Sequence, residues 1–361
     1  MMRLRDHRLY TYRLRYAQPV RWSDIVEDAA PFVLLRLIAD DGSEGVAEIT
    51  VKPTWCGVSA RSLIAAIDDI FIPILKKLDL DDSAGIRAAF DIVPENQAAK
   101  MLIDNACWDL QAARQGRPLW QIWNGHSRVE LSWAVTRQEP RAMADEAARM
   151  IGSYGFRTLK VKGGQGIAKD IAVIREIRAA AGDEIRLYVD ANGAYSLAEA
   201  SDYASALADC GIVLLEDPCP LAPDRHFGKL RRDSPIPILV DFGCGSLRDA
   251  HLFIEQGAQA LSVKPGRFGL THARTMRDMA EQKRCDVVVG LMGESALGTL
   301  AGLQFASTIA DPILPAELTW FMAMTEQVIS QVPPIVDGSI KLTESPSLAA
   351  LIDWKAVEAS R

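Results

Sequence analysis

The chain has 361 residues, of which 49% are hydrophobic and 24% are charged, so it can bury a large core, either as one large barrel or as two domains. Its net charge of -7 is modest and its Lys and Arg residues are scattered, so a nucleic-acid partner is not expected. The most apolar stretches, such as Pro235–Val240, are far shorter than the roughly 20 residues that cross a bilayer, and Met1–Arg15 has no apolar signal region. We therefore expect a cytoplasmic protein with no membrane partner.

The first 125 residues predict a separate α+β domain. Extended segments are expected at Leu9–Leu14 and Val33–Ile38, with a turn at Asp40–Gly42 between strands. Helices are expected around Leu63–Leu75 and Asn96–Arg114.

From residue 126 to 325, short apolar runs alternate with helical patterns, which is typical of a parallel sheet built from βα units of about 25 residues. Seven strands are predicted: Leu131–Val135, Thr158–Val161, Arg186–Val189, Ile212–Leu215, Ile236–Val240, Leu261–Val263 and Val287–Val289. Helices are predicted between them at Ile167–Ala181, Leu197–Cys210, Leu247–Gln256 and Thr271–Lys283.

An open doubly wound sheet is the rival architecture, and it would need a Gly-rich phosphate loop after its first strand. That position holds Thr136–Pro140 instead, and Gly163–Gly166 after the second strand has the composition of a tight turn. We therefore predict an α/β fold, a (β/α)8-type (modified TIM) barrel with an N-terminal α+β capping domain. The segment 326–361, with a turn at Asp337–Gly338, is expected to pack back on that domain.

Nearly every predicted barrel strand ends in a charged residue. In barrel enzymes the catalytic residues lie at the carboxyl ends of the strands. The charged residues at these strand ends are Lys162, Asp190, Glu216, Asp241 and Lys264. The carboxylates of Asp190, Glu216 and Asp241 close three successive strands and should converge, which suits Mg²⁺ or Mn²⁺ as the cofactor. Zinc is disfavoured because none of the five histidines or six widely spaced cysteines joins the set.

Lys160 and Lys162 lie two residues apart on one strand, so their side chains share a face and each should lower the pKa of the other. One of them can then act as a neutral base. Lys264 ends a strand on the other side of the carboxylates, which would place one lysine on each face of a bound substrate. We predict removal of the proton next to a substrate carboxylate, with Lys160 and the metal stabilising the resulting enediolate.

These motifs resemble the enolase superfamily, specifically its muconate cycloisomerase (muconate lactonizing enzyme) subgroup within the mandelate racemase/muconate lactonizing enzyme family. The similar segments are Asn105–Leu110, Lys160–Lys162, Val189–Asn192, Leu215–Pro218, Val263–Pro265, Gly293–Thr299, Ala316–Leu318, Thr325–Glu326 and Val332–Leu342. The resemblance implies that Asp190, Glu216 and Asp241 bind Mg²⁺ and that Lys162 and Lys264 are the acid and base. It also implies a homo-oligomer, since relatives are commonly dimers or octamers.

The resemblance further implies that Glu294 lines the pocket opposite the metal, and that two capping loops, near Pro19–Asp28 and Ile49–Val58, set specificity. Asn192, in the motif of the first metal ligand, is expected to contact the substrate. Trp55 and Trp320 are expected to form an aromatic wall for a ring or a quaternary ammonium group, or else to pack between the domains.

Three differences from the motifs of this family and its subgroups limit the range of expected reactions. Phe242 follows the third ligand where the subgroup usually has a second acid, which removes an expected partner of Lys264 and would change its pKa. No His follows the seventh strand, which disfavours mandelate-racemase chemistry, and no Asp-x-Asp lies near the eighth, which disfavours a dipeptide substrate.

Cycloisomerisation, racemisation or epimerisation of an amino-acid derivative, and dehydration of the o-succinylbenzoate synthase type share the same first step. We favour an isomerase acting on a small-molecule carboxylate, and keep open a barrel that binds a ligand without turnover.

Overall fold

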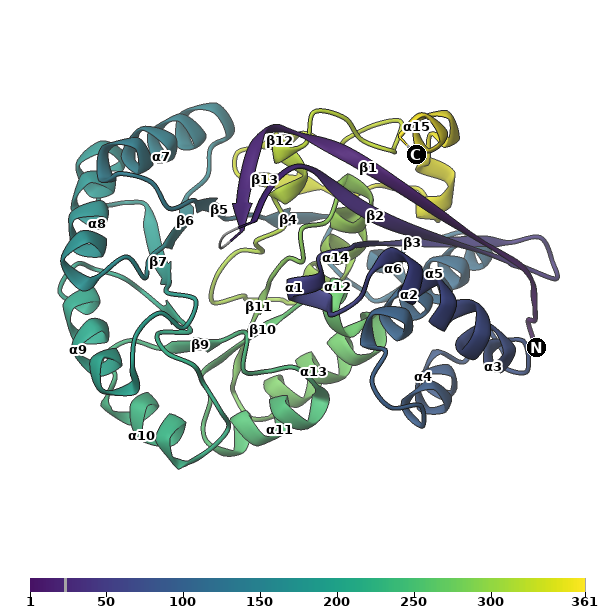
Figure 1. The fold of residues 1–361 in the computed structure, drawn as a ribbon, viewed down its shortest axis with the longest axis horizontal. Helices are drawn as coiled ribbons and strands as arrows, with labels where there is room; N and C mark the ends of the chain where they lie inside the picture. The colour runs from purple at the N-terminus through teal and green to yellow at the C-terminus, as the bar shows by residue number, and fades with distance from the viewer. Residues whose placement is uncertain (23–24, 361) are drawn as a thin grey trace.

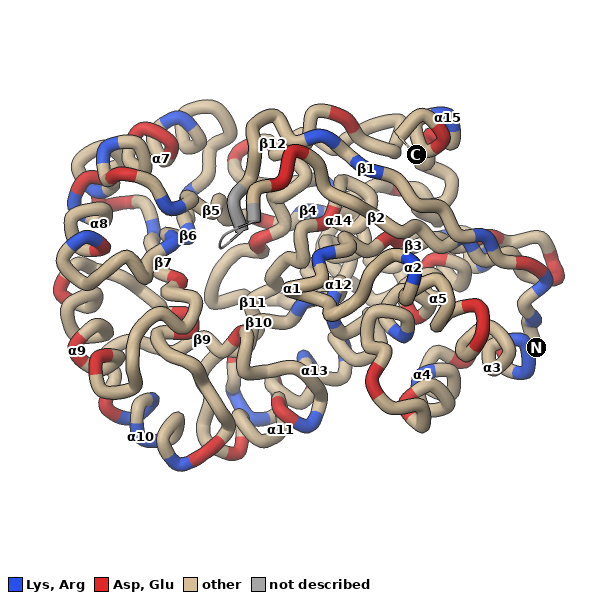
Figure 2. Tube along the Cα trace, in the orientation of Figure 1, with Lys and Arg blue, Asp and Glu red and all other residues tan. Residues whose placement is uncertain are grey.

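The computed structural model describes residues 1–22 and 25–360, and it divides into a cap and a curled parallel sheet wrapped by helices, with the C-terminus lying beside β1 (Figure 1). Positively and negatively charged residues are interspersed along the outer helices (Figure 2). Within these ranges, no helix is both long and apolar enough to cross a membrane.

The cap is built on a three-stranded antiparallel sheet in the order β1-β2-β3. Its strands are β1 (Leu4–Trp22), β2 (Ile25–Ala39) and β3 (Glu44–Thr50). The first two are much longer than predicted. Polar and apolar residues alternate along β1, where Tyr12, Leu14 and Tyr16 are buried while the residues between them are exposed, and β2 is buried along most of its second half. Most of the predicted loop Pro19–Asp28 therefore belongs to these strands, and its Ser23 and Asp24 lie outside the described residues.

The helices of the cap pack on this sheet. They are α1 (Pro53–Cys56), α2 (Ala60–Ala66), α3 (Ile72–Leu75), α4 (Ser83–Asp91), α5 (Gln97–Gln115) and α6 (Leu119–Ile122). The helix predicted at Leu63–Leu75 is interrupted by a π-helical turn at Ile67–Phe71. Pro73 explains the wider turn, because it has no N–H to donate to the carbonyl four residues earlier.

All seven predicted barrel strands are confirmed, and they form one parallel sheet in the order β11-β10-β9-β8-β7-β6-β5. They are β5 (Trp133–Val135), β6 (Thr158–Lys162), β7 (Arg186–Asp190), β8 (Leu215–Glu216), β9 (Ile238–Val240), β10 (Ala260–Val263) and β11 (Asp286–Val289). A further segment joins the two edges: Glu317 N–H donates to the Val289 carbonyl (2.8 Å), and Ser132 N–H donates to the Ala316 carbonyl (2.9 Å). The predicted (β/α)8-type barrel with its capping domain is confirmed.

The connecting helices cover the outside of this sheet (Figure 1). They are α7 (Pro140–Tyr154), α8 (Ile167–Ala181), α9 (Leu197–Ala208), α10 (Arg225–Asp233), α11 (Leu247–Glu255), α12 (Pro265–Phe268), α13 (Leu270–Gln282) and α14 (Ala296–Ala306). The four helices predicted from periodicity correspond to α8, α9, α11 and α13 within two residues at each end.

The C-terminal segment contacts both units. The predicted turn at Asp337–Gly338 connects β12 (Ile335–Val336) to β13 (Ser339–Lys341), which pairs with β4 (Arg128–Glu130) at the start of the barrel. Further along, α15 (Trp354–Ala359) lies against β1, where Tyr10 and Trp354 have ring centroids 5.3 Å apart. The division of the chain at residues 125 and 325 stays a prediction.

A buried carboxylate on β3 joins the cap to the barrel. Glu48 accepts the N–H groups of Ser295 (2.8 Å) and Gly298 (3.0 Å) in the first turn of α14, and its other oxygen accepts the hydroxyls of Ser295 (2.7 Å) and Tyr12. Helix N-termini favour negative charge. The cap thus supplies the acceptor that this barrel helix needs at its buried N-terminus.

Asp109 on α5 connects three segments of the chain. Its carboxylate accepts the N–H groups of Val46 (2.9 Å) on β3 and of Leu348 (2.6 Å) in the C-terminal segment, and the hydroxyl of Ser347 (3.0 Å). Burial raises the pKa of Asp109 to about 6, although these hydrogen bonds lower it. This residue therefore holds the C-terminal segment on the cap.

We predict that Asp109→Ala lowers the free energy of unfolding by about 3 kcal/mol or more, because it leaves at least two buried N–H groups without an acceptor. The change is measured by urea denaturation at pH 7. Asp353→Ala is the control: Asp353 caps α15 at an exposed position, and its loss should cost only about 1 kcal/mol. Equal losses in both variants would contradict this assignment.

Candidate active site

The charged strand ends predicted from the sequence lie together at the carboxyl ends of β6 to β10. Lys162 pairs in register with Asp190, and Asp190 with Glu216, so these three form a row across β6, β7 and β8. Asp241 directly follows β9 and Lys264 directly follows β10. Two lysines therefore flank three carboxylates on consecutive strands.

Lys160 lies two residues before Lys162 on β6, and its ammonium group contacts three carboxylates. Its Nζ is 3.2 Å from Asp190 Oδ2, 2.7 Å from Glu216 Oε2 and 2.9 Å from Glu317 Oε1. Tyr188 donates its hydroxyl to the same Glu317 oxygen (2.7 Å). No function was predicted for Glu317, because its segment was not recognised as a barrel strand; beside it, Ala316 forms only an isolated bridge with Leu131.

The expected lowering of the Lys160 pKa is wrong. Burial of the ammonium lowers its pKa, but the negative charges of Glu216, Glu317 and Asp190 outweigh burial and raise the pKa well above its ordinary value. With only 5% of its side chain exposed, Lys160 is a fixed cation rather than a neutral base.

The other two lysines each have one close carboxylate and are more accessible. Lys162 Nζ lies 2.6 Å from Asp190 Oδ2, and Lys264 Nζ lies 2.6 Å from Asp241 Oδ2. Their side chains are 30% and 12% exposed. Phe242, which stands where a second acid was expected, is exposed. Lys264 pairs with Asp241 instead. Burial lowers the Lys264 pKa, but Asp241 and Glu216 raise it by a larger amount.

The three carboxylates fit a hard divalent cation. Burial and the charge of Asp190 raise the pKa of Glu216 well above its usual range. Glu216 Oε1 and Asp241 Oδ1 are buried oxygens without a hydrogen bond. Within the described residues, no group of three or more His, Cys, Asp or Glu side chains is arranged to hold a metal ion. Lys162 and Lys264 pair with two of these carboxylates instead. Buried, unsatisfied carboxylate oxygens on adjacent strands are nevertheless the donors that Mg²⁺ and Mn²⁺ prefer.

Asp217, the residue after Glu216, binds the backbone that directly follows β9. Its carboxylate accepts the N–H groups of Asp241 (3.1 Å) and Phe242 (2.8 Å). Burial and the charge of Asp241 raise the Asp217 pKa to about 7. The sequence motif contained this residue, but only the fold shows that it orients Asp241.

Asn192 orients the first carboxylate. Its N–H donates to Asp190 Oδ1 (2.8 Å) and its Nδ2 donates to Asp190 Oδ2 (3.1 Å), while Arg137 reaches its side-chain oxygen (3.2 Å). The backbone of Asn192 has a φ of 49°, a left-handed conformation that asparagine tolerates. Asn192 therefore lies beside the metal-ligand candidates.

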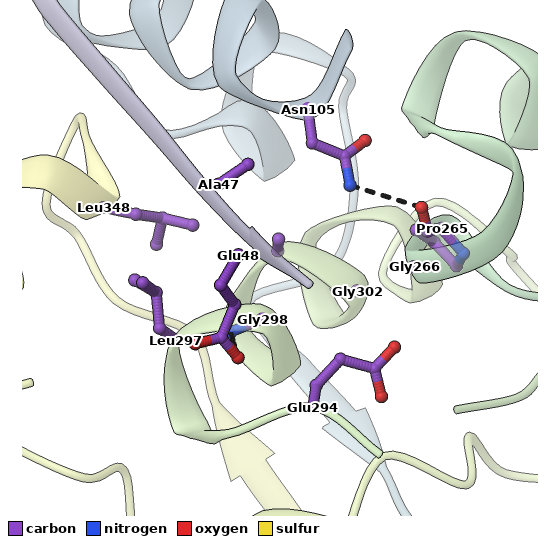
Figure 3. Close-up of a pocket in the computed structure, with 11 residues that line it drawn as sticks. Ala47, Glu48, Asn105, Pro265, Gly266, Glu294, Leu297, Gly298, Gly302 and Leu348 are labelled. Carbon is purple, nitrogen blue, oxygen red and sulfur yellow. Dashed lines mark hydrogen bonds between the residues drawn. The ribbon is translucent and has the colours of Figure 1, made fainter. Parts of the chain in front are cut away.

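Glu294 lies in the loop between β11 and α14, next to the turn that follows Lys264 (Figure 3). Its Oε2 accepts the N–H of Met292 (2.7 Å), and burial raises its pKa to about 7. Behind it lies a small cavity of about 10 Å³ between cap and barrel, with Glu48 and Asn105 in its wall. That volume is close to the minimum that holds one water molecule.

Trp55 and Trp320 belong to one aromatic cluster centred on the cap. The rings of Tyr16 and Trp320 meet edge to face with centroids 6.0 Å apart. The Lys52 ammonium lies 5.7 Å from the Tyr16 centroid and 5.5 Å from the Trp55 centroid, and it pairs with Glu27. Two of these aromatic faces therefore already attract a cation of the chain itself.

Comparison with known proteins identifies relatives of both units. The family described as Enolase C-terminal domain-like matches residues 142–356, and the family described as Mandelate racemase / muconate lactonizing enzyme, N-terminal domain, matches residues 8–123. A crystal structure of muconate lactonizing enzyme from Mucobacterium smegmatis, complexed with muconolactone, superposes with a TM-score of 0.93 at 28% identity, covering 99% of each chain.

Three curated relatives catalyse different reactions, as their names state. Muconate cycloisomerase 1-2 of Acinetobacter lwoffii is 27% identical over 352 residues, 95% of this chain and 91% of the relative. The o-succinylbenzoate synthase of Geobacillus kaustophilus is 26% identical over 336 residues, 91% of this chain and 88% of the relative. The L-Ala-D/L-Glu epimerase of Bacillus subtilis (strain 168) is 30% identical over 289 residues, 77% of this chain and 78% of the relative.

We predict that Lys160→Met destabilises the metal-free protein by about 3–5 kcal/mol, because three buried carboxylates lose their shared cation. Urea denaturation in EDTA measures the loss, and adding Glu317→Gln should recover part of it by removing one negative charge. Lys169→Met, which breaks a surface pair with Glu139, should cost less than about 1 kcal/mol. A double variant no more stable than Lys160→Met would refute the charge balance described above.

Proposed function

Because the chain belongs to the enolase superfamily, in its muconate cycloisomerase subgroup, we propose that it removes the α-proton of a small carboxylate with a lysine base. The observation that carries this proposal is the arrangement of Lys162 and Lys264 on either side of Asp190, Glu216 and Asp241. A proton can then be taken from one face of the substrate and delivered to the other.

The proposed functions of the lysines follow from their surroundings. Lys162 and Lys264 are partly accessible and each has a single close carboxylate, so they exchange protons with the α-carbon. Lys160 stays charged among its carboxylates and stabilises negative charge on the enediolate oxygens. Glu317 and Tyr188 hold Lys160 in that position.

We propose that Asp190, Glu216 and Asp241 bind Mg²⁺, with Mn²⁺ as the other suitable cation. When bound, such a cation supplies Lewis-acid polarisation of the substrate carboxylate, which acidifies the neighbouring C–H bond. Asn192 and Asp217 orient two of its three ligands.

Among the reactions that start with this step, we propose an isomerase, a cycloisomerase or a racemase/epimerase. The relatives favour this choice, since cycloisomerases and an epimerase are among them, and a lyase of the o-succinylbenzoate synthase type is the alternative. Substrate contacts are proposed for Glu294, Asn192, Trp55 and Trp320, with the aromatic cluster facing a ring or a quaternary ammonium group. A cytoplasmic location and a homo-oligomeric state stay predictions.

The central test is deuterium incorporation from D2O, in the presence of Mg²⁺, into both enantiomers of a panel of α-substituted carboxylates that includes aromatic and betaine members. We predict that Lys162→Ala lowers the exchange rate of one enantiomer by about 10²-fold or more, and that Lys264→Ala lowers that of the other enantiomer by a similar factor. Mass spectrometry reads the exchange, and Lys169→Ala is the control with wild-type rates. A wild-type protein that exchanges no member of the panel would favour the non-catalytic binding role.

A second prediction concerns the metal. Asp217→Ala should weaken Mg²⁺ binding by about 10–100-fold, because Asp241 loses the carboxylate that orients its backbone. Isothermal titration calorimetry measures the affinity. Asp224→Ala, which removes the exposed cap of α10 after the same strand, should leave it unchanged. The metal proposal fails if the wild-type protein binds no Mg²⁺ at millimolar concentration.

A further inference from the structure

Lys264 owes its position to the short turn that follows it. The Lys264 carbonyl accepts the N–H groups of Arg267 (2.8 Å) and Phe268 (2.9 Å), so the lysine is the first residue of the α12 turn. The next helix, α13, begins at Leu270. Any displacement of the turn therefore moves the backbone that carries the Lys264 side chain.

The cap fastens this turn at two points, while the barrel contacts it through the end of β10 and through the Arg267 side chain, which donates to the Asp241 carbonyl (3.4 Å). Asn105 on α5 donates its Nδ2 hydrogen to the Pro265 carbonyl (3.2 Å), and its Oδ1 accepts the N–H of Leu270 (2.8 Å) (Figure 3 shows the first of these bonds). Asn105 is buried, so water does not substitute for either partner without entering the interface.

Two neighbours on α4 and α5 hold the middle of the turn. Arg87 Nη1 donates to the Phe268 carbonyl (2.8 Å), and Gln97 Nε2 donates to the Arg267 carbonyl (3.0 Å). The carbonyl groups of residues 265, 267 and 268 are therefore all bound by side chains of the cap.

The glycines of the turn allow this close approach from two sides. A Cβ on Gly266 would lie 2.3 Å from Glu294 Oε1, and a Cβ on Gly269 would lie 2.6 Å from Asp104 Oδ2. Gly269 also has a φ of 81°, which favours glycine. The turn is thus confined between the barrel loop that carries Glu294 and the cap helix α5.

Lys162 is held differently. The loop after it is fixed by Asp170 on α8, whose carboxylate accepts the N–H groups of Gly164 (2.7 Å) and Gln165 (3.1 Å) and the hydroxyls of Tyr195 (2.8 Å) and Tyr203 (2.7 Å). These residues all belong to the barrel. The two lysines therefore depend on different parts of the chain for their positions.

We propose that Asn105 is a positioning residue for Lys264, so that docking of the cap sets the geometry of one of the two proton-transfer lysines and leaves the other to the barrel. The inference rests on the proposed function only in calling Lys264 an acid/base. A misplacement of about 1 Å at such a group is enough to lower a rate about 100-fold. Asn105 thereby couples the domain that covers the site to one face of the substrate.

The first test needs no substrate. Pulse acetylation with acetic anhydride at a single pH, in the presence of Mg²⁺, reports the availability of each lysine amine through its tryptic peptide. We expect Asn105→Ala and Asn105→Leu to change the labelling rate of Lys264 by about fivefold or more, because each variant loses two buried hydrogen bonds and the loss of one corresponds to about fivefold. The labelling of Lys162 should stay at the wild-type rate.

The matched control is Thr271→Val. Thr271 lies one residue beyond the turn, inside α13, where its hydroxyl bonds Asp104 (2.5 Å) and accepts the indole N–H of Trp108 (2.9 Å). This variant weakens the same cap–barrel interface without touching the α12 turn, so Lys264 labelling should not change. Thermal melting confirms that each variant is folded.

The second test uses the panel carboxylate whose two enantiomers the wild type exchanges fastest. In Asn105→Ala, kcat for the enantiomer that depends on Lys264 should fall about 100-fold while kcat for the other stays within a factor of two to three. Equal losses for both enantiomers, or an unchanged Lys264 labelling rate in both folded Asn105 variants, would overturn the proposal. If the wild type exchanges nothing, the proposed function fails, and the labelling result still decides whether Asn105 positions Lys264.

Discussion

The balance of charge inside the carboxyl end of the barrel is the constraint on which the site depends. Asp190, Glu216 and Glu317 are buried within reach of a single ammonium, Lys160, and like charges at these distances are costly in a poorly hydrated interior. Buried carboxylate oxygens of Glu216 and Asp241 have no hydrogen-bond partner, so their negative charge is not fully compensated. The proposed divalent cation would complete this balance.

The interface between cap and barrel is built from buried polar side chains as well as from apolar packing. Glu48 completes the N-terminus of α14, Asn105 fastens the turn after Lys264, and Asp109 holds the C-terminal segment. Such groups are costly if their partners are removed, so the docked position is well defined. Under the proposed function, the cap is therefore part of the framework that positions the site and not only a cover over the barrel mouth.

The relatives are named for several reactions, and under the proposed mechanism these reactions share the first bond that breaks and differ in the steps that follow. Specificity must then come from the walls of the site. The residues proposed for these walls include Trp55 and Trp320. The Lys52 ammonium lies over the rings of Tyr16 and Trp55, and Trp320 meets Tyr16 edge to face. Phe242, which directly follows Asp241, is exposed and adds an apolar surface at that place.

The sequence by itself determined the strand order and the row of charged strand ends, because parallel strands bring their carboxyl ends to one edge whatever the connections between them. It did not determine the direction of the Lys160 pKa, which is raised by Glu216, Glu317 and Asp190 together, and Glu317 lies 157 residues away in the chain. Nor did it reveal the bond between Asn105 and Pro265, separated by 160 residues. These contacts are set by how cap and barrel pack, and local pattern carries no signal for a hydrogen bond or an electrostatic shift formed across such a distance.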